Sequence, residues 1–324
     1  MTARPLRLRG AGALAAAAAL LVSGCSATGA PADPESSGDS GPAPTGVELT
    51  AGQFSWTAAA VETEILAAVV EDHPELGVSS IETVNVDPAT GWVGLGRGDI
   101  DLLTEVNLPN QQKFADETDQ STELVSRTYG DAAQGWFVPR YLVEPGGAAE
   151  GLKSVDQLDE YAEEVGGVLY DGDPGWVTTD QNAQRLEGFG LDIEHRPSSE
   201  AASIAQLKRA YHRQEPVLVF AYRPHWLFEQ YDLVQLEEPS PYEEDCFTGE
   251  KKACAIPAQD VWTAAHQDVA EQAPAFHEAL GRFQIPLEEI EAILKESEDT
   301  GAEPADLARQ WVDGHQDEVE SWLG

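Results

Sequence analysis

The sequence predicts an α/β fold, because short apolar strands and amphipathic helices alternate along most of the chain. Residues 216–220 form a continuous run of β-branched and aromatic side chains, typical of a buried strand. Residues 57–72 carry apolar side chains at helical spacing. Elements that alternate in this way form a sheet of parallel type. The chain has 324 residues, 42% of them hydrophobic, which suffices for two ordinary domains.

The first half of the chain begins with an expected strand at 47–54 and a helix at 57–72. Val61, Ile65 and Val69 mark the apolar face of this helix. Further strands are expected at 81–86, 121–128 and 135–139.

In the second half, Ile204, Leu207 and Tyr211 mark another helix, at 201–214, which leads into the strand at 216–220. The elements expected before this helix are a helix at 152–164, a strand at 167–170, a turn at 171–176 and a helix at 177–186. A strand at 232–236 ends the alternation, and helices are then expected at 258–271, 274–283, 287–298 and 304–322. Trp262, Trp311 and Trp322 fall on these last helices and are interpreted as packing residues.

The N-terminal segment predicts export and lipid attachment. Three arginines precede an apolar stretch within residues 1–24, as in a secretory signal peptide. The small pair before Cys25 resembles a bacterial lipobox, so Cys25 is predicted to be the lipidated first residue of the mature chain; the alternative is a cysteine that follows a signal peptide by coincidence. Residues 25–46 would then be this cysteine and a flexible tether, because they contain hardly any apolar side chain after Cys25. More than one acyl chain makes such anchoring stable, on the extracytoplasmic face of the bacterial cell membrane.

The formal net charge of −39 argues against nucleic acid as a partner. We interpret the excess of carboxylates as a solvated surface, suited to high salt. Of the three cysteines, Cys246 and Cys254 remain once Cys25 is assigned to lipid, and a structural disulfide between them is expected in an exported chain.

No motif for an enzyme, a metal site or a cofactor occurs in the sequence. A Gly-x-Ser-x-Gly elbow, a Walker loop and a His-Glu-x-x-His pair are all missing, and the seven histidines are scattered. The glycines spaced over 91–98 do not match a phosphate loop, because no helical pattern follows them.

Aromatic residues stand at four places where a strand ends in a turn: Trp56, Trp92, Trp176 and the pair Tyr222 and Trp226. Ligands of α/β proteins bind at such strand ends. Core packing explains each ring alone equally well, and a hydrophobic staple explains the first one. Together the rings favour a cleft for a quaternary ammonium group, which has no N–H to donate and is bound by ring faces.

Several sequence blocks resemble the glycine betaine and choline-binding proteins of ABC importers. The blocks are Trp56 before a helix, Gly98 to Leu102 followed by Glu105, Gly135 to Pro139, Asp171 to Thr178, and Tyr222 to Trp226. Their order and spacing match the family over 47–322, including the cysteine loop. The resemblance implies a two-lobed, periplasmic-binding-protein-like fold of type II with the ligand cleft between the lobes. Lobe I would comprise 47–136 and 233–324, and lobe II 137–232.

The resemblance also implies an aromatic cage for the trimethylammonium group, with the ligand carboxylate held by backbone amides or polar side chains. Carried over by position, the cage residues are Trp56, Trp92, Trp176 and Tyr222, with Trp226 as a fifth candidate.

His225 is expected either to contact the anionic end of the ligand or to be satisfied by neighbouring backbone. Glu105 and Asp173 are candidate counterions for the cationic headgroup. Two positions depart from the family: Asn107 stands where a tryptophan is frequent, and Thr57-Ala58 follows the first cage tryptophan where many choline-binding members have an acid. The second departure favours a zwitterionic betaine.

The sequence thus predicts an extracytoplasmic receptor that captures glycine betaine or a related quaternary amine for osmoprotection. It would deliver this solute to an ABC permease and its ATPase subunits. No catalytic residue, cofactor or metal is expected. The alternatives are a receptor for choline, or for an amino acid or osmolyte without methyl groups, which Asn107 favours; a lipoprotein enzyme or sensory partner has no motif to support it.

Overall fold

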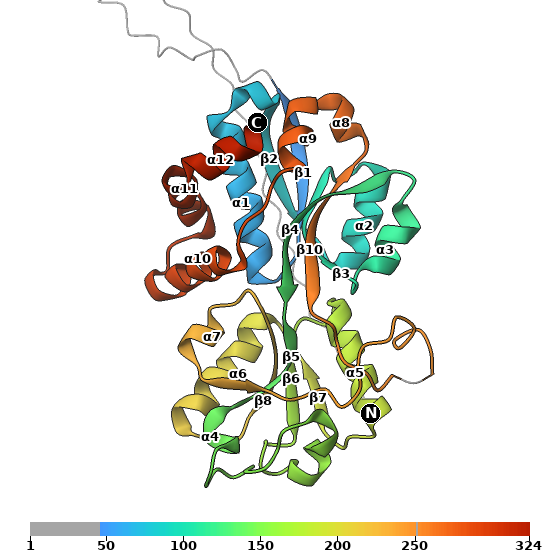
Figure 1. Cartoon of the computed structure of the whole chain (residues 1–324), viewed down its shortest axis with the longest axis vertical. Coiled ribbons are helices and arrows are strands. Elements are labelled where there is room, and N and C mark those ends of the chain that lie inside the picture. The colour runs from blue at the N-terminus through green and yellow to red at the C-terminus, as the bar shows by residue number, and fades with distance from the viewer. Residues whose placement is uncertain (1–45, 251) are drawn as a thin grey trace, which may run out of the picture. The chain divides into compact units, whose positions relative to one another are not determined.

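The computed structural model describes residues 46–250 and 252–324, whose strands form two five-stranded sheets (Figure 1). The predicted signal peptide, Cys25 and all of the tether except Gly46 lie outside the described residues. Each sheet is the centre of one lobe.

The sheet of the first lobe has the order β2-β1-β3-β10-β4. Its strands are β1 (Val47–Gln53), β2 (Val78–Asn85), β3 (Leu102–Leu108), β4 (Thr122–Ala132) and β10 (Gln259–His266). The first three are parallel, and β10 runs antiparallel to both β3 and β4.

The sheet of the second lobe has the order β7-β6-β8-β5-β9. Its strands are β5 (Gln134–Pro139), β6 (Val168–Asp171), β7 (Glu194–Pro197), β8 (Leu218–Tyr222) and β9 (Leu233–Gln235). Here β6, β7 and β8 are parallel, whereas β5 is antiparallel to β8 and β9. The predicted two-lobed α/β fold is confirmed, with mixed rather than purely parallel sheets.

The chain crosses between the lobes at other places than predicted. β4 continues through Ala133 into β5, so a boundary after residue 136 would cut the second sheet. β9 was expected in lobe I, but it pairs with β5 through the partners Val138 and Val234. The return crossing therefore lies just before β10, and the described residues 233–250 and 252–257 accompany the second lobe.

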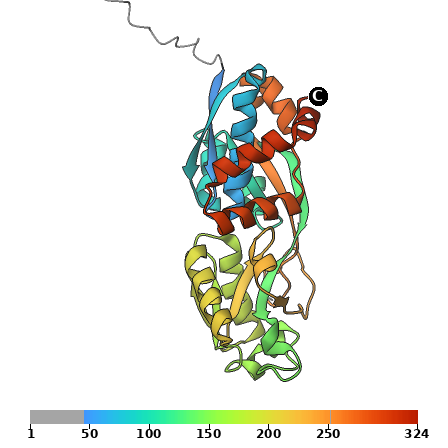
Figure 2. The same cartoon turned by 90° about the vertical axis from the view of Figure 1, so that its left-hand side faces the viewer.

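Helices cover both sheets. In the first lobe α1 (Thr57–Asp72), which matches its predicted range, packs against α10 (Leu287–Thr300) and α11 (Pro304–Gly314) (Figure 2). The remaining helices of this lobe are α2 (Pro88–Arg97), α3 (Gln112–Thr118), α8 (Asp268–Gln272), α9 (Pro274–Leu280) and α12 (Gln316–Leu323). Those of the second lobe are α4 (Arg140–Val143), α5 (Val177–Phe189), α6 (Glu200–Arg213) and α7 (Leu227–Gln230). No helix in the described ranges is long and apolar enough to cross a membrane.

Four predicted elements differ from the structure. The helix expected at 304–322 is interrupted at His315 and forms α11 and α12, and the helix expected at 152–164 is a 3₁₀ helix over Val155–Tyr161. The segment 258–271, expected to be one helix, is β10 followed by α8. Val261 and Thr263 are buried while Trp262 between them is only partly buried, which is the alternation of a strand. Pairing with strands on both sides of β10 outweighs helix propensity here.

The glycine-rich segment 91–98 lies mainly in a helix, α2, instead of a loop. Asp87 caps this helix by accepting a 2.9 Å hydrogen bond from the Thr90 N–H, and Gly98 ends it in the left-handed conformation. A Cβ atom on Gly94 would lie 2.8 Å from Ile100, so the small residue permits close packing. Helix propensity alone would not identify this helix.

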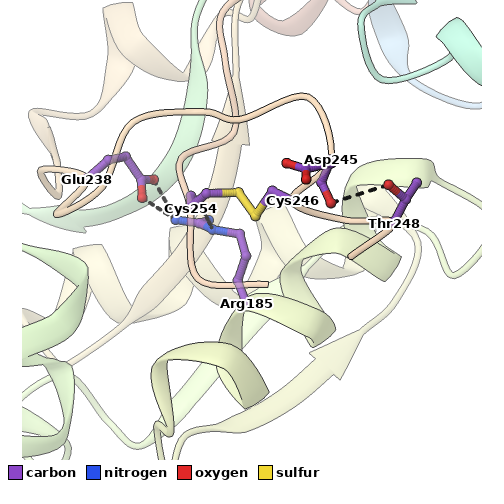
Figure 3. Close-up of a disulfide and its surroundings, with 6 residues drawn as sticks. All are labelled: Arg185, Glu238, Asp245, Cys246, Thr248 and Cys254. Atoms are coloured by element: carbon purple, nitrogen blue, oxygen red, sulfur yellow. Dashed lines mark hydrogen bonds and ion pairs between the residues drawn. A yellow bond between two sulfur atoms is a disulfide. The ribbon is translucent and has the colours of Figure 1, made fainter. Parts of the chain in front are cut away.

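The predicted disulfide joins Cys246 and Cys254, both 1% exposed. Arg185 of α5 lies beside it (Figure 3): Nε donates to the Cys254 carbonyl at 3.0 Å, and the guanidinium pairs with Glu238. The guanidinium also lies 4.4 Å from the ring centre of Trp136. These contacts attach the disulfide segment to the second lobe.

We expect the double replacement Cys246→Ser and Cys254→Ser to lower the free energy of unfolding by about 2–3 kcal/mol, because a short closed loop restricts the unfolded chain. Urea unfolding followed by circular dichroism measures this change. A reductant should destabilise the wild type equally and leave the double variant unchanged. If neither the double replacement nor the reductant shifted the urea midpoint of unfolding, the disulfide would not have this stabilising role.

Candidate ligand-binding site

A cavity lies between the two lobes, where the ends of strands and the N-termini of helices from both lobes meet. Its lining comes from the first lobe (Trp56, Pro88, Glu105, Asn107, Asn110 and Gln111), the second lobe (Trp176, Val177, Thr178, Phe220, Tyr222 and Arg223) and the crossing strands (Ala132, Gln134 and Gln259). The wall is therefore partly aromatic and partly amide, with few charged groups.

Three aromatic rings from both lobes meet at this cavity. Trp56 and Trp176 are the N-cap residues of α1 and α5, with extended backbone, so their rings stand beside the helix starts. Their ring centres are 5.7 Å apart at 90°, and Trp176 meets Tyr222 in the same way at 5.8 Å. Phe54 stacks on Trp56 at 4.4 Å from the other side. These contacts fix the angles between the rings.

A buried carboxylate faces the same cavity. Glu105 on β3 is 2% exposed, and its backbone is left-handed, with φ of 57°. Its Oε2 accepts a hydrogen bond from Trp56 Nε1 at 3.0 Å, and its Oε1 accepts one from the Tyr129 hydroxyl. The carboxylate is thus aligned with an indole of the aromatic wall.

A second acid lies directly behind Glu105. Glu62 on α1 is fully buried, and its Oε2 accepts the Glu105 backbone N–H at 3.3 Å. Burial, and then the charge of Glu105, raise the pKa of Glu62 well above its usual range. Burial also raises the pKa of Glu105, but hydrogen bonds from Tyr129, Trp56 and Glu62 oppose this shift. We therefore assign the proton of the pair to Glu62 and the negative charge to Glu105.

Neutral polar groups form the opposite part of the wall. Asn110 Nδ2 donates to Thr178 Oγ at 2.8 Å, and the Thr178 hydroxyl donates to Gln134 Oε1 at 3.3 Å. The Asn110 backbone N–H donates to Gln259 Oε1 at 3.1 Å. Asn107 Nδ2 is held by the Glu105 carbonyl at 2.8 Å. Amides and hydroxyls of this kind can both donate to and accept from a polar ligand end.

Hydrogen bonds join the lobes around the cavity. Besides the bond from Asn110 to Thr178, Trp176 Nε1 donates to Ser55 Oγ at 2.8 Å, and the Thr57 backbone N–H donates to Glu200 Oε2 at 3.2 Å. The described lobes are therefore in contact across the site.

Over residues 47–314 the chain matches OpuAC, the substrate binding domain of ABC-type glycine betaine transport systems. The chain belongs to this family. Its members are binding proteins and not enzymes, as the sequence predicted, and this one is a substrate-binding component of the ABC-importer type. Such components act on the extracytoplasmic side of the membrane.

Two curated relatives are similar to this binding protein. The glycine betaine/carnitine transport binding protein GbuC of Listeria monocytogenes is 26% identical over 155 residues, which are 47% of each chain. The glycine betaine-binding periplasmic protein OusX of Dickeya dadantii is 23% identical over 285 residues, covering 77% of this chain and 81% of that protein. The first match therefore spans about half of the relative's length.

Solved structures share the fold. Lactococcal OpuAC in its closed conformation with glycine betaine has a TM-score of 0.71 and 20% identity, covering 86% of this chain and all of that one. An ABC-transporter choline binding protein in complex with choline has a TM-score of 0.71 and 20% identity, covering 85% and 91%. At such identities the likeness concerns the fold, and it confirms the predicted type II binding-protein architecture.

Of the predicted site residues, four line the cavity of the binding protein: Trp56, Trp176, Tyr222 and Glu105. Asp173 does not line it; its Oδ1 accepts the Gly175 N–H at 3.1 Å and so stabilises the turn before α5. A short-range turn contact therefore accounts for this acid.

Trp92 and Trp226 do not line the cavity either. Trp92 lies in the core at 1% exposure, because its segment is helical, and its Nε1 donates to Gln111 Oε1 at 2.8 Å behind the wall. Trp226 packs against Tyr231, with the Lys208 ammonium 4.7 Å from its ring centre. Both are packing residues in the structure.

His225 lines a smaller cavity behind Tyr222 and Phe220, beside the main one. Its Nε2 lies 3.5 Å from Glu200 Oε1, and its Nδ1 accepts the Leu227 N–H at 3.1 Å. It thus faces an anionic group of the protein, and neighbouring backbone satisfies Nδ1 but not Nε2.

Four residues at or beside the cavities were not predicted from the sequence: Glu62, Tyr129, Phe220 and Glu200. Glu62 did leave a signal, since it falls on the apolar face of α1 together with Val61 and Ile65. An acid on such a face indicates a buried, paired carboxyl. For Glu200, at the start of α6, the sequence indicated a favourable first-turn acid and no more. In the part of the chain that the structure describes, no group of three or more His, Cys, Asp or Glu could hold a metal ion.

The carboxyl pair predicts a pH dependence of stability. The unfolded Glu62 loses its proton near its ordinary pKa of 4.5, while the folded protein retains it to higher pH. The unfolded state then binds fewer protons, so the free energy of unfolding falls as the pH rises through the raised pKa. Glu62→Gln should reduce this decline, by up to about 1.4 kcal/mol per pH unit.

Urea unfolding at several values between about pH 5 and pH 8 tests this dependence. Glu48→Gln is the matched control, because Glu48 is exposed on β1. If Glu62→Gln and wild type lost stability in parallel over this range, the assignment of the proton to Glu62 would be wrong.

Proposed function

We propose that this binding protein captures a quaternary ammonium osmolyte of the glycine betaine and choline class in the cavity between its lobes, and delivers it to an ABC permease and its ATPase subunits. The observation that carries the proposal is the meeting of Trp56, Trp176 and Tyr222 with the Glu105 carboxylate at one cavity. The names of the relatives agree, since they mention glycine betaine, carnitine and choline.

The chemistry of the wall suits a methylated cation. A quaternary ammonium group cannot donate hydrogen bonds, so it gains little from amides and more from ring faces, about 0.5–2 kcal/mol each when desolvated. Trp56 and Trp176 are 8% and 6% exposed, so the rings present a dry surface. Glu105 supplies the opposite charge without displacing the rings, since Trp56 and Tyr129 hold it from the side.

The bonds between the lobes would close the cavity over the solute. Exclusion of water strengthens both the cation–ring and the charge–charge attractions. Binding in this mechanism needs no covalent step, and the permease would recognise the closed form.

A second candidate is a solute without methyl groups, such as an amino acid or a cyclic osmolyte. Asn107, Asn110 and Gln134 favour it, because they offer hydrogen bonds that a methyl group cannot use. Competition by unmethylated glycine or ectoine against a bound quaternary amine distinguishes the two. Displacement by either solute at comparable concentration would favour the second candidate.

Loss of a cage ring should weaken binding of the preferred quaternary amine. We expect Trp176→Ala and Tyr222→Ala each to cost about 1–3 kcal/mol of binding free energy, or roughly five- to hundredfold in Kd, through lost ring contacts. Isothermal titration calorimetry with glycine betaine, proline betaine, choline and carnitine measures this loss.

Tyr222→Phe keeps the ring and removes only the hydroxyl, which donates to Glu200, so it separates the contribution of the ring from that of the hydroxyl. Trp262→Phe, on β10 and outside the cavity lining, controls for a general loss of tryptophan. Unchanged affinity in either alanine variant would remove that residue from the cage. If none of the four ligands bound at millimolar concentration, the proposed function would be wrong.

We also propose that Cys25 carries the lipid that attaches the mature protein to the outer side of the cell membrane. The sequence before Cys25 supports this, as does the run of small and polar residues up to residue 46. Cys25→Ser should move the protein from the membrane fraction to the soluble fraction in a bacterial host that lipidates exported proteins. Mass spectrometry of the N-terminus gives an independent result; an unmodified Cys25 in membrane-bound wild type would contradict the proposal.

A further inference from the structure

We infer that Glu200 supplies from within the protein the carboxylate that a betaine ligand would bring, so that the site selects quaternary ammonium cations without a carboxylate, of the choline type, over zwitterionic betaines. The inference rests on the proposed function, because it concerns selectivity at that cavity, which shares Trp176, Phe220 and Tyr222 with the smaller cavity that Glu200 lines.

Glu200 accepts hydrogen bonds from donors beside the aromatic rings that would otherwise be free to bind an anionic ligand group. Its Oε2 accepts the Thr57 N–H at the start of α1, a helix end whose dipole favours negative charge. Its Oε1 accepts the hydroxyl of Tyr222, a ring of the cavity wall. One carboxylate of the second lobe thus covers a helix start of the first lobe and a cage residue.

His225 is the third donor directed at Glu200. Its Nδ1 accepts the Leu227 N–H, which places the ring hydrogen on Nε2. This atom is buried, with the side chain 1% exposed, and has no hydrogen-bond partner in the described residues; Glu200 Oε1 lies 3.5 Å away. A small movement of the carboxylate would complete this bond. The anion at this place therefore already belongs to the protein.

The remaining charges near the cavity do not compensate a ligand carboxylate. Among the described residues that line the cavity, Glu105 and Arg223 are charged. The Arg223 guanidinium is engaged elsewhere, with Nε 3.4 Å from Glu291 and Cζ 5.0 Å from the ring centre of Phe228. Glu200 lines the smaller cavity on the far side of Tyr222, next to the one that Glu105 lines. A zwitterion would thus bring its anionic end near two carboxylates, whereas a cation meets only attraction.

The neutral part of the wall suits a hydroxyl group. Asn110, Thr178 and Gln134 form a chain of donors and acceptors that a single alcohol can join in both roles. A quaternary ammonium alcohol would place its methyl groups against the rings and its hydroxyl against this chain.

Calorimetry on the purified binding protein with choline, glycine betaine and the methyl ester of glycine betaine tests the inference. We expect wild type to bind choline at least about tenfold more tightly than glycine betaine, with the ester, which keeps the cation but has no carboxylate charge, closer to choline. Glu200→Gln, which keeps the shape and removes the charge, should narrow the choline-to-betaine ratio at least about threefold. Glu163→Gln, on an exposed loop of the second lobe, should leave the ratio unchanged.

The ratio of affinities is the measured quantity, because a general loss of closure in Glu200→Gln would weaken both ligands alike. Equal or tighter binding of glycine betaine by wild type overturns the inference while the proposed function stands. A ratio that Glu200→Gln leaves unchanged also overturns the assignment to Glu200. If no quaternary amine binds, the proposed function itself fails, and the inference fails with it.

Discussion

The buried carboxylate of Glu105 must accept hydrogen bonds from the groups around it, and this requirement fixes the position of several neighbours. Trp56 and Tyr129 donate to its oxygens, while Glu62 behind it accepts the backbone N–H. The left-handed φ of 57° at Glu105 costs about 1–3 kcal/mol for a residue with a side chain, which the tight fit must offset. The Trp56 ring on the cavity wall is thus positioned by the acid, and the acid by the core of the first lobe.

Much of the fold followed from local patterns. The helix 57–72 was predictable because its apolar side chains recur at helical spacing, and the strand at 167–170 because its burial alternates. The strand at 135–139 was predictable as a continuous apolar run, since every residue of β5 is buried. The failures have a common cause in tertiary contacts. β10 is a strand because β3 and β4 pair with it on both sides, and α2 is a helix because close packing accommodates its glycines. The local sequence of β10 or α2 shows neither the paired strands nor the packing partners, because these lie far away along the chain.

A site residue could be predicted where its position follows from the helix or strand that contains it. Trp56 and Trp176 each precede a helix in the sequence, and the structure has both at the cavity. Glu200 could not be found in this way, because it acts on Thr57, 143 positions earlier. The sequence shows no acid beside Trp56 and therefore favoured a zwitterionic ligand, but the second lobe brings an acid to that position.

Trp56 and Trp176 lie edge to face although each begins a helix of a different lobe. Indole emission shifts with the polarity around the ring, and separating the lobes would wet both rings and break the bond from Trp176 to Ser55. The intrinsic tryptophan fluorescence of the protein therefore reports on whether its lobes are closed. Its emission spectrum should differ between open and closed molecules without an attached dye.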